Sequence, residues 1–172
     1  MTSVKNHKGL FSSLRPDLIV KGAFDIPFEK LQAEGYKAAL LDYDNTIGPD
    51  RTWEPSEYSR QVIDKLNFLG YKICLVSNAK SNRSANIAKI LDIPCVTCAH
   101  KPSTKGLVEA SKMLDVELDK CLMIGDQLFT DIAAGNNAGS FSILVEPYAS
   151  KEVWYVKIKR PLEKIVRFFM KF

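Results

Sequence analysis

The stretch Leu40-Leu41-Asp42-Tyr43-Asp44-Asn45-Thr46 decides the fold of this chain. It completes an apolar run that begins at Ala38, and a near-continuous apolar run is typical of a strand buried on both faces of a parallel sheet. Asp42 and Asp44 leave the end of that strand one residue apart, so both carboxylates point to the same side. In open α/β sheets, ligands bind beyond the carboxyl ends of the strands. We therefore expect these two carboxylates to lie in a functional site.

Apolar runs alternate with helical patterns after this first strand. The expected strands are 38–44, 72–78, 94–99, 120–126 and 140–147, and the expected helices are 54–69, 81–91, 103–114 and 128–137. Repeated strand–helix–strand units predict a parallel sheet with right-handed crossovers and helices on both faces. The predicted fold class is therefore α/β, a three-layer Rossmann-like fold with a parallel sheet of about five strands. The residues before the first strand predict a lead-in helix or an irregular arm, with its helical turn at 28–34.

The 172 residues suit one compact domain with a sizeable core. We divide this domain into an N-terminal arm (1–37), a catalytic core (38–147) and a basic tail (148–172). One helix fills most of the span between Asp44 and Ser77, so the sequence leaves no room for a large inserted cap domain. No stretch approaches the roughly 20 apolar residues that cross a bilayer, and no long apolar segment marks a secretory signal. We expect a cytoplasmic protein.

The basic charge of the chain gathers in its tail. Residues 151–172 hold seven Lys or Arg and two Glu, whereas the whole chain has a net charge of +4. On a helix over 157–172, apolar residues occupy one face and basic residues another, which is typical of helices that bind anionic membrane surfaces. The tail therefore predicts peripheral contact with the inner face of a membrane, or a helix that packs on the core. Because the charge does not form an aromatic-studded patch, we expect no nucleic-acid partner.

Cys95 and Cys98 form a C-x-x-C pair followed by His100, which resembles half of a zinc site. A structural zinc site needs four ligands, and no second Cys or His pair lies nearby in the sequence. We therefore favour ordinary thiols, with metal binding by Cys95 and Cys98 as the alternative.

Polar side chains also follow the other expected strands. These side chains belong to Ser77, Asn78, Lys101, Asp126 and, one helical turn further along the chain, Asp131. Carboxylates crowded at one sheet edge repel each other unless a cation lies between them. Mg²⁺ prefers oxygen ligands. Asp42 and Asp126 therefore predict a magnesium site, with the backbone carbonyl of Asp44 as the third ligand.

The same residues suit the transfer of a phosphoryl group. A carboxylate such as that of Asp42 can attack phosphorus and form an acyl phosphate. Asp44 is placed to protonate the leaving oxygen and then to activate water. The Ser77 hydroxyl can hold a phosphate oxygen, and Lys101 can neutralise the charge that develops in the transition state. The sequence thus favours an enzyme that hydrolyses phosphate esters.

This set of residues resembles the four motifs of the haloacid dehalogenase (HAD) superfamily. The motifs are D-x-D-x-T at 42–46, Ser77 after an apolar strand, Lys101, and G-D-x4-D at 125–131. The resemblance implies that Asp42 is the nucleophile and a Mg²⁺ ligand, that Asp44 is the general acid/base of a phosphatase, and that Asp126 is a Mg²⁺ ligand. It also implies that Asp131 orients Lys101 or a metal-bound water. Thr46, Ser77 and Asn78 are the candidate phosphate-binding residues.

A closer resemblance covers more of the chain. The segments at 14–21, 25–27, 40–47 (LLDYDNTI) and 77–83 (SNAKSNR) are similar to the YqeG-type phosphatases of HAD subfamily IIIA. Relatives of that group are phosphatidylglycerophosphate phosphatases of phospholipid synthesis, so the resemblance implies a phosphorylated substrate and points to a membrane phospholipid. An open site without a cap suits such a substrate. A phosphatase for soluble phosphometabolites or phosphoproteins, and a non-catalytic binding or regulatory protein, are the alternatives.

Overall fold

The computed structural model describes residues 12–80 and 82–148, which form an open parallel sheet covered by helices on both faces. The strands are β1 (Leu18–Val20), β2 (Ala38–Leu41), β3 (Lys72–Val76), β4 (Cys95–Val96), β5 (Cys121–Gly125) and β6 (Phe141–Val145). The strand order is β1-β6-β5-β2-β3-β4, and each neighbouring pair is parallel. The predicted α/β class, with a parallel Rossmann-like sheet, is confirmed.

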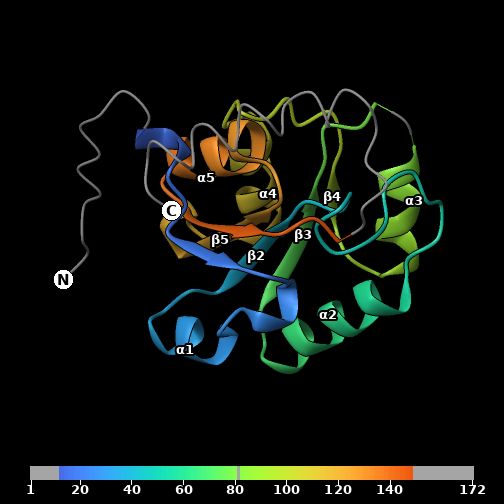
Figure 1. The fold of residues 1–172 in the computed structure, drawn as a ribbon, viewed down its shortest axis with the longest axis horizontal. Helices are drawn as coiled ribbons and strands as arrows, with labels where there is room; N and C mark the ends of the chain where they lie inside the picture. The colour runs from blue at the N-terminus through green and yellow to red at the C-terminus, as the bar shows by residue number, and fades with distance from the viewer. Residues whose placement is uncertain (1–11, 81, 149–172) are drawn as a thin grey trace.

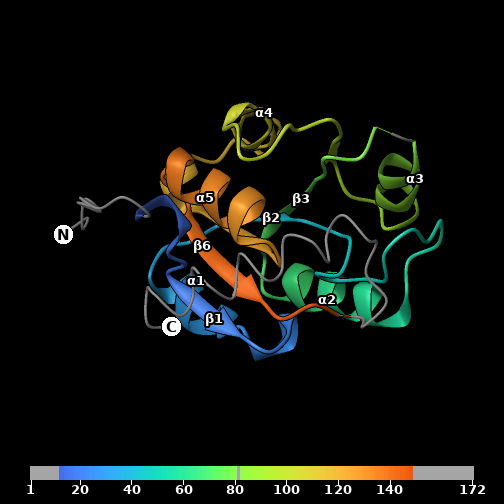
Figure 2. The same ribbon diagram turned by 45° about the horizontal axis from the view of Figure 1, so that its top comes forward.

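The helices form the two outer layers of the fold. They are α1 (Phe28–Ala33), α2 (Glu57–Phe68), α3 (Arg83–Ile90), α4 (Lys105–Leu114) and α5 (Ala133–Ala138), and a π-helical turn, η4 (Leu128–Ile132), precedes α5. Helices α1 and α2 lie on one side of the sheet, and α4 and α5 lie on the other (Figures 1 and 2). Because side chains alternate along a strand, Leu41 of β2 packs in the cluster with Leu66, and Leu40 packs with Leu107. Strand β2 is therefore buried on both faces, as its apolar run predicts.

Helix α2 begins later than the pattern of apolar residues indicates. The expected helix starts at Glu54, but the hydroxyl of Ser56 accepts a hydrogen bond from the Ser59 amide at 3.1 Å and caps the first turn. An N-cap residue satisfies an amide that has no partner inside the helix, so it defines the first helical residue. Asp42 is therefore joined to Glu57 by a long loop, which carries the remaining residues of the first motif.

The sheet has a sixth strand, β1, in the segment that the sequence predicts as an irregular arm. The Asp17 amide donates to the Ser142 carbonyl at 2.9 Å, and the Asp17 carboxylate accepts from the Ser142 amide at 2.8 Å. These bonds dock β1 on β6 at the sheet edge. Only three half-buried residues form β1, which is too short for the alternation that identifies a strand in a sequence. The expected helical turn at 28–34 matches α1.

The connections around the site carry no inserted domain within the described residues. From Asp42 to Cys95, the described residues form one loop, α2, β3 and α3, so this part of the chain contains no cap domain. None of the helices within 12–80 and 82–148 has the length and apolar character needed to span a bilayer. The basic segment 157–172 lies outside the described residues.

Candidate active site

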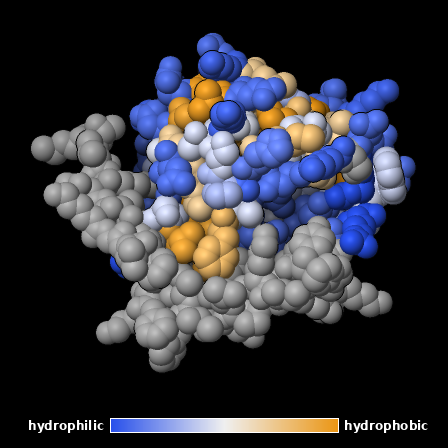
Figure 3. Space-filling model, turned by 90° about the horizontal axis from the view of Figure 1, so that it is seen from above, coloured by the Kyte–Doolittle hydropathy of each residue, from blue (hydrophilic) through white to orange (hydrophobic). Residues whose placement is uncertain are grey.

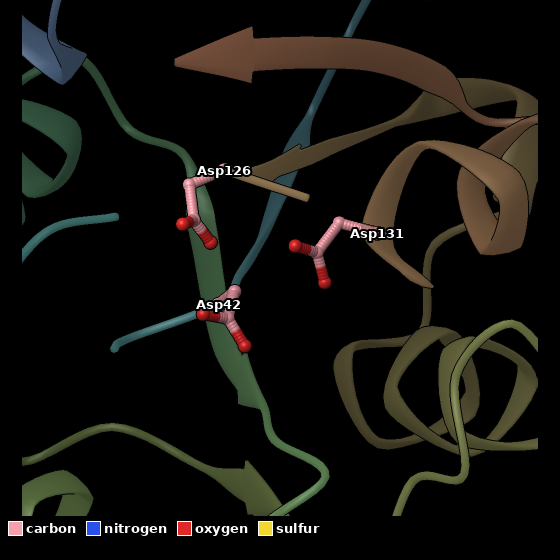
Figure 4. Close-up of side chains that lie close together, drawn as sticks. All are labelled: Asp42, Asp126 and Asp131. Atoms are coloured by element: carbon pink, nitrogen blue, oxygen red, sulfur yellow. The ribbon is translucent and has the colours of Figure 1, made fainter. Parts of the chain in front are cut away.

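Three buried aspartates converge beyond the carboxyl ends of the central strands. Asp42 follows β2, Asp126 follows β5, and Asp131 belongs to η4. One carboxylate oxygen from each side chain lies within 4.8 Å of the others, and all three residues are buried. Figure 4 shows the three carboxylates around a common space. The sheet thus brings together residues that lie far apart in the sequence.

Lys101 is fixed at this site by three contacts. Its Nζ atom lies 2.7 Å from Asp42 Oδ1 and 2.7 Å from Asp131 Oδ1, and it donates to the Val76 carbonyl at 2.7 Å. Lys101 thus donates hydrogen bonds to Asp42 and Val76 and forms an ion pair with Asp131. The Lys101 side chain is 1% exposed, which removes water as a competitor for these contacts. Lys101 therefore places a fixed positive charge beside Asp42.

Burial and charge act in opposite directions on this pair. Burial raises the pKa of Asp42 to about 7, although the Lys101 ammonium acts to lower it. Burial acts to lower the pKa of Lys101, but the carboxylates of Asp131 and Asp42 outweigh burial and raise that pKa above its usual range. Lys101 thus stays charged, and a further positive charge beside Asp42 would favour its ionised form.

The residues at this point fit a divalent cation. Asp42, Asp126 and Asp131 provide three carboxylates against the single ammonium of Lys101, which leaves a net negative charge when all are ionised. The Thr46 hydroxyl lies 3.4 Å from Asp42 Oδ2 and 3.4 Å from Asp126 Oδ1, so it adds another oxygen. A hard cation such as Mg²⁺ prefers such oxygen ligands.

The position of Asp131 depends on a glycine and on the π-helical turn. A Cβ atom added to Gly125 would lie 2.4 Å from Asp131 Cβ, so the side chain of Asp131 packs directly on the backbone of Gly125. The Gln127 amide donates to Asp131 Oδ2 at 3.1 Å. The glycine of the G-D-x4-D motif therefore has a steric reason, because a residue with a side chain at 125 would displace Asp131.

The loop after Asp42 folds back sharply over the site. The Tyr43 carbonyl accepts hydrogen bonds from the amides of Thr46, Ile47 and Gly48 at 3.2, 3.2 and 3.1 Å. Gly48 has no room for a side chain, because an added Cβ would lie 2.3 Å from the Tyr43 ring. This tight turn returns Thr46 to the carboxylates and leaves the Asp44 side chain partly exposed.

The two polar residues after β3 have different surroundings. The Ser77 hydroxyl accepts from the Ala79 amide at 3.1 Å and from the Ser84 hydroxyl at 3.0 Å. The Asn78 amide group donates to the Lys101 carbonyl at 3.0 Å and accepts from the Lys101 amide at 2.7 Å. Asn78 therefore ties the end of β3 to the segment that carries Lys101, whereas the sequence suggests a phosphate contact for it.

Arg83 is a residue of the site to which the sequence assigns no role. Its guanidinium forms a bidentate ion pair with Asp44: Nη1 donates to Oδ1 at 2.6 Å, and Nη2 donates to Oδ2. The Asp44 carboxylate thus pairs with Arg83, and the acidic trio is completed by Asp131. The backbone carbonyl of Asp44, which the sequence predicts as a metal ligand, takes no part in this ion pair. The two residues lie 39 positions apart, and an Arg that begins a helix carries no signal of such a contact.

The C-x-x-C pair does not form a metal site within the described residues. Cys95 is half-buried and Cys98 is exposed, and both are free thiols. Burial raises the pKa of Cys95 to about 11, which disfavours the thiolate that binds metals. Among residues 12–80 and 82–148, the converging ligand group is the acidic trio of Asp42, Asp126 and Asp131.

Known proteins resemble this chain in sequence and in fold. The family model of haloacid dehalogenase-like hydrolases matches residues 5–139. "Probable phosphatase YqeG" of Bacillus subtilis (strain 168) is 32% identical over 152 residues, which are 87% of each chain. "Phosphatidylglycerophosphate phosphatase 1, chloroplastic" of Chlamydomonas reinhardtii is 26% identical over 174 residues, and the match spans 91% of this chain but 65% of that protein, under two thirds. The crystal structure of an uncharacterized protein from Listeria monocytogenes serotype 4b matches with a TM-score of 0.55 at 13% identity, over 68% of this chain and 84% of that one.

Proposed function

Because the chain belongs to the haloacid dehalogenase-like hydrolases and is a phosphatase, we propose that it hydrolyses phosphomonoesters through a phosphorylated Asp42, with Mg²⁺ as cofactor. One observation carries this proposal: the buried Asp42 carboxylate lies 2.7 Å from the fixed ammonium of Lys101, beside two further carboxylates. Such a group suits both a nucleophile and a divalent cation. A binding protein without activity would have no chemical need for it.

The roles follow from the positions of the side chains. Asp42 attacks phosphorus, and the leaving oxygen takes a proton from Asp44, so an acyl phosphate and an alcohol form. Lys101 stabilises the negative charge that develops on the transferred phosphoryl group. Thr46 and Ser77 hold phosphate oxygens, and Asn78 acts by holding the backbone of Lys101.

Mg²⁺ would be held by Asp42 and Asp126, with the backbone carbonyl of Asp44 as a further ligand. When bound, it supplies the positive charge that offsets the crowded carboxylates and the substrate phosphate. Asp131 orients Lys101, to which it is bonded at 2.7 Å. Asp131 also belongs to the acidic trio, so its charge would help to attract the cation.

For the substrate, we propose a membrane phosphomonoester such as phosphatidylglycerophosphate. A relative named for that activity supports this choice, and so does the absence of a cap domain between Asp42 and Cys95. On the face seen in Figure 3, the described apolar side chains form separate spots on a mainly hydrophilic surface. We assign membrane contact to the basic segment 157–172, because its pattern of apolar and basic residues suits an anionic surface, and this segment would hold a cytoplasmic enzyme at the inner face of the membrane.

A substrate comparison tests the proposed function. We expect Mg²⁺-dependent phosphate release from phosphatidylglycerophosphate in mixed micelles, at a kcat/KM well above that for a panel of soluble phosphoesters. Asp42→Asn should remove the activity and keep the fold, because an amide is a poor nucleophile and a poor metal ligand. Equal, low rates on all substrates would exclude the lipid assignment and favour a soluble phosphometabolite.

Removal of residues 161–172 tests the membrane contact separately. The shortened chain should keep its activity on soluble esters and lose its binding to anionic liposomes. Unchanged liposome binding, or loss of the fold together with the tail, would contradict the membrane role of this segment.

A further inference from the structure

We propose that Arg83 is a positioning residue that holds the Asp44 carboxylate ready to accept a proton from water when the phosphoenzyme is hydrolysed. This inference rests on the proposed function, because it concerns the second half of the same reaction. The bidentate pair between Arg83 and Asp44 is the contact from which it starts.

The hydrogen bonds from Arg83 fix the orientation of the Asp44 carboxylate. A guanidinium group donates hydrogen bonds and cannot accept them. Both Asp44 oxygens accept from Arg83, so the orientation of the carboxylate is fixed. A bidentate pair uses one lone pair on each oxygen and leaves another on each. The carboxylate is thus fixed in place and still able to take up a proton.

The two side chains of this ion pair differ in their exposure to solvent. The Arg83 side chain is 10% exposed, whereas that of Asp44 is 26% exposed. The arginine therefore lies beneath the carboxylate, and the carboxylate faces the side that water reaches. An arginine that bound substrate directly would present its own guanidinium to the solvent.

Arg83 also holds the loop that carries Asp44. Its Nη1 atom donates to the Thr52 carbonyl at 3.4 Å, and the Asn86 side chain donates to the Trp53 carbonyl at 3.0 Å. The first turns of α3 thus hold two successive residues of the loop between β2 and α2. A cation in the first turn of a helix opposes the helix dipole, so helix stability does not account for an Arg at this position.

The step that Arg83 supports is the hydrolysis of phosphorylated Asp42, and its atoms and charges balance. A water oxygen attacks the phosphorus of phosphorylated Asp42, and the bond between phosphorus and the Asp42 oxygen breaks. Asp42 leaves as a carboxylate, and the proton of the water passes to Asp44, so hydrogen phosphate is released. Asp44 then carries the proton that the next leaving alcohol requires.

The kinetics of Arg83→Gln with p-nitrophenyl phosphate distinguish this positioning role from a purely structural one. The nitrophenolate leaves without a proton, so the first half-reaction does not need Asp44 as an acid. In stopped-flow experiments with Mg²⁺, we expect the burst of nitrophenolate to keep a rate within about twofold of the wild type. The steady-state rate should fall about a hundredfold, because a misplaced catalytic group costs about that much. Phosphorylated enzyme should accumulate.

Three variants serve as controls. Arg60→Gln changes an exposed arginine of α2 in the same way and should leave both phases unchanged. Arg83→Lys keeps the charge but gives up the bidentate geometry, so its steady-state rate should lie between those of the wild type and Arg83→Gln. In the Asp44→Asn background, Arg83→Gln should cause no further loss, because Arg83 acts through Asp44.

The outcomes distinguish this inference from the proposed function. If the burst and the steady state fall together in Arg83→Gln, or if its loss adds fully to that of Asp44→Asn, Arg83 is only structural and the inference is wrong. Unchanged hydrolysis of the phosphoenzyme would also overturn it. If the wild type releases no nitrophenolate and forms no phosphoenzyme, the proposed function itself fails.

Discussion

Asp42 must be ionised to act as a nucleophile, yet its burial opposes ionisation. Burial raises its pKa to about 7, against the effect of Lys101 at 2.7 Å. A bound cation would counter the effect of burial, because it interacts favourably with the charged form alone. Metal binding and ionisation of Asp42 should therefore be coupled.

We expect the affinity for Mg²⁺ to fall below pH 7. A proton on Asp42 competes with the metal, so the apparent Kd should rise by about tenfold per pH unit well below that pKa. Calorimetric titration with Mg²⁺ at pH 8 and pH 5.5 measures the effect. Asp42→Asn should bind Mg²⁺ more weakly and lose most of this pH dependence. Equal affinities of the wild type at both pH values would contradict the coupling.

At the scale of single residues, the sequence indicated which side chains lie near each other at the sheet edge. It did not indicate every contact that each of them makes. Residues directly after apolar strands must reach the same sheet edge, and so Asp42, Lys101 and Asp126 were identifiable as neighbours. The pairing of Asp44 with Arg83 depends on how the loop and α3 pack on each other. No local pattern in the sequence encodes that packing.

Among the elements, the junction between β5 and η4 sets the geometry of the site. Gly125→Ala should displace Asp131, since the new Cβ would lie 2.4 Å from Asp131 Cβ. We expect kcat to fall about a hundredfold, as for other small displacements of catalytic groups. The strain should also lower the free energy of unfolding by about 1–3 kcal/mol. Kinetics and urea unfolding of the purified variant measure both effects.

Gly139→Ala is the matched control for this substitution. Gly139 has φ of +78° and no atom within 4 Å of an added Cβ, so its replacement adds backbone strain without a clash. A residue with a side chain in this conformation costs about 1–2 kcal/mol. The control should therefore lose stability and keep its kcat. If Gly125→Ala also kept its kcat, close packing of Asp131 on Gly125 would not matter for activity.

The order of strands and helices was predictable from the sequence because long buried runs leave a clear pattern. Strand β1 was missed because three half-buried residues at an edge do not form such a pattern. The start of α2 was misplaced because a single side-chain hydrogen bond of Ser56 decides it. The position of an edge strand or of a helix cap depends on individual contacts. The positions of the central strands are visible in an apolar pattern that many residues share.

At the scale of the whole fold, the described residues form one parallel sheet, and the catalytic residues lie at an edge of it that no cap covers. Within the parallel sheet, β5, β2, β3 and β4 are successive neighbours, so the motif residues that follow them reach one edge, and Asp42 and Asp126 meet where β2 and β5 end. The described connections add no cap, so access to Asp42 depends on the loop between β2 and α2. This architecture was predictable from the alternation of elements, but the arrangement of the loop was not.

Direct detection of the phosphorylated residue tests the central claim that Asp42 is the nucleophile. The enzyme is mixed with Mg²⁺ and substrate, quenched in acid during turnover, digested and analysed by mass spectrometry. We predict a phosphoryl group on the peptide that contains Asp42, which is released by hydroxylamine and absent from Asp42→Asn. A phosphoryl group on another residue, or Mg²⁺-dependent turnover by Asp42→Asn, would contradict the account.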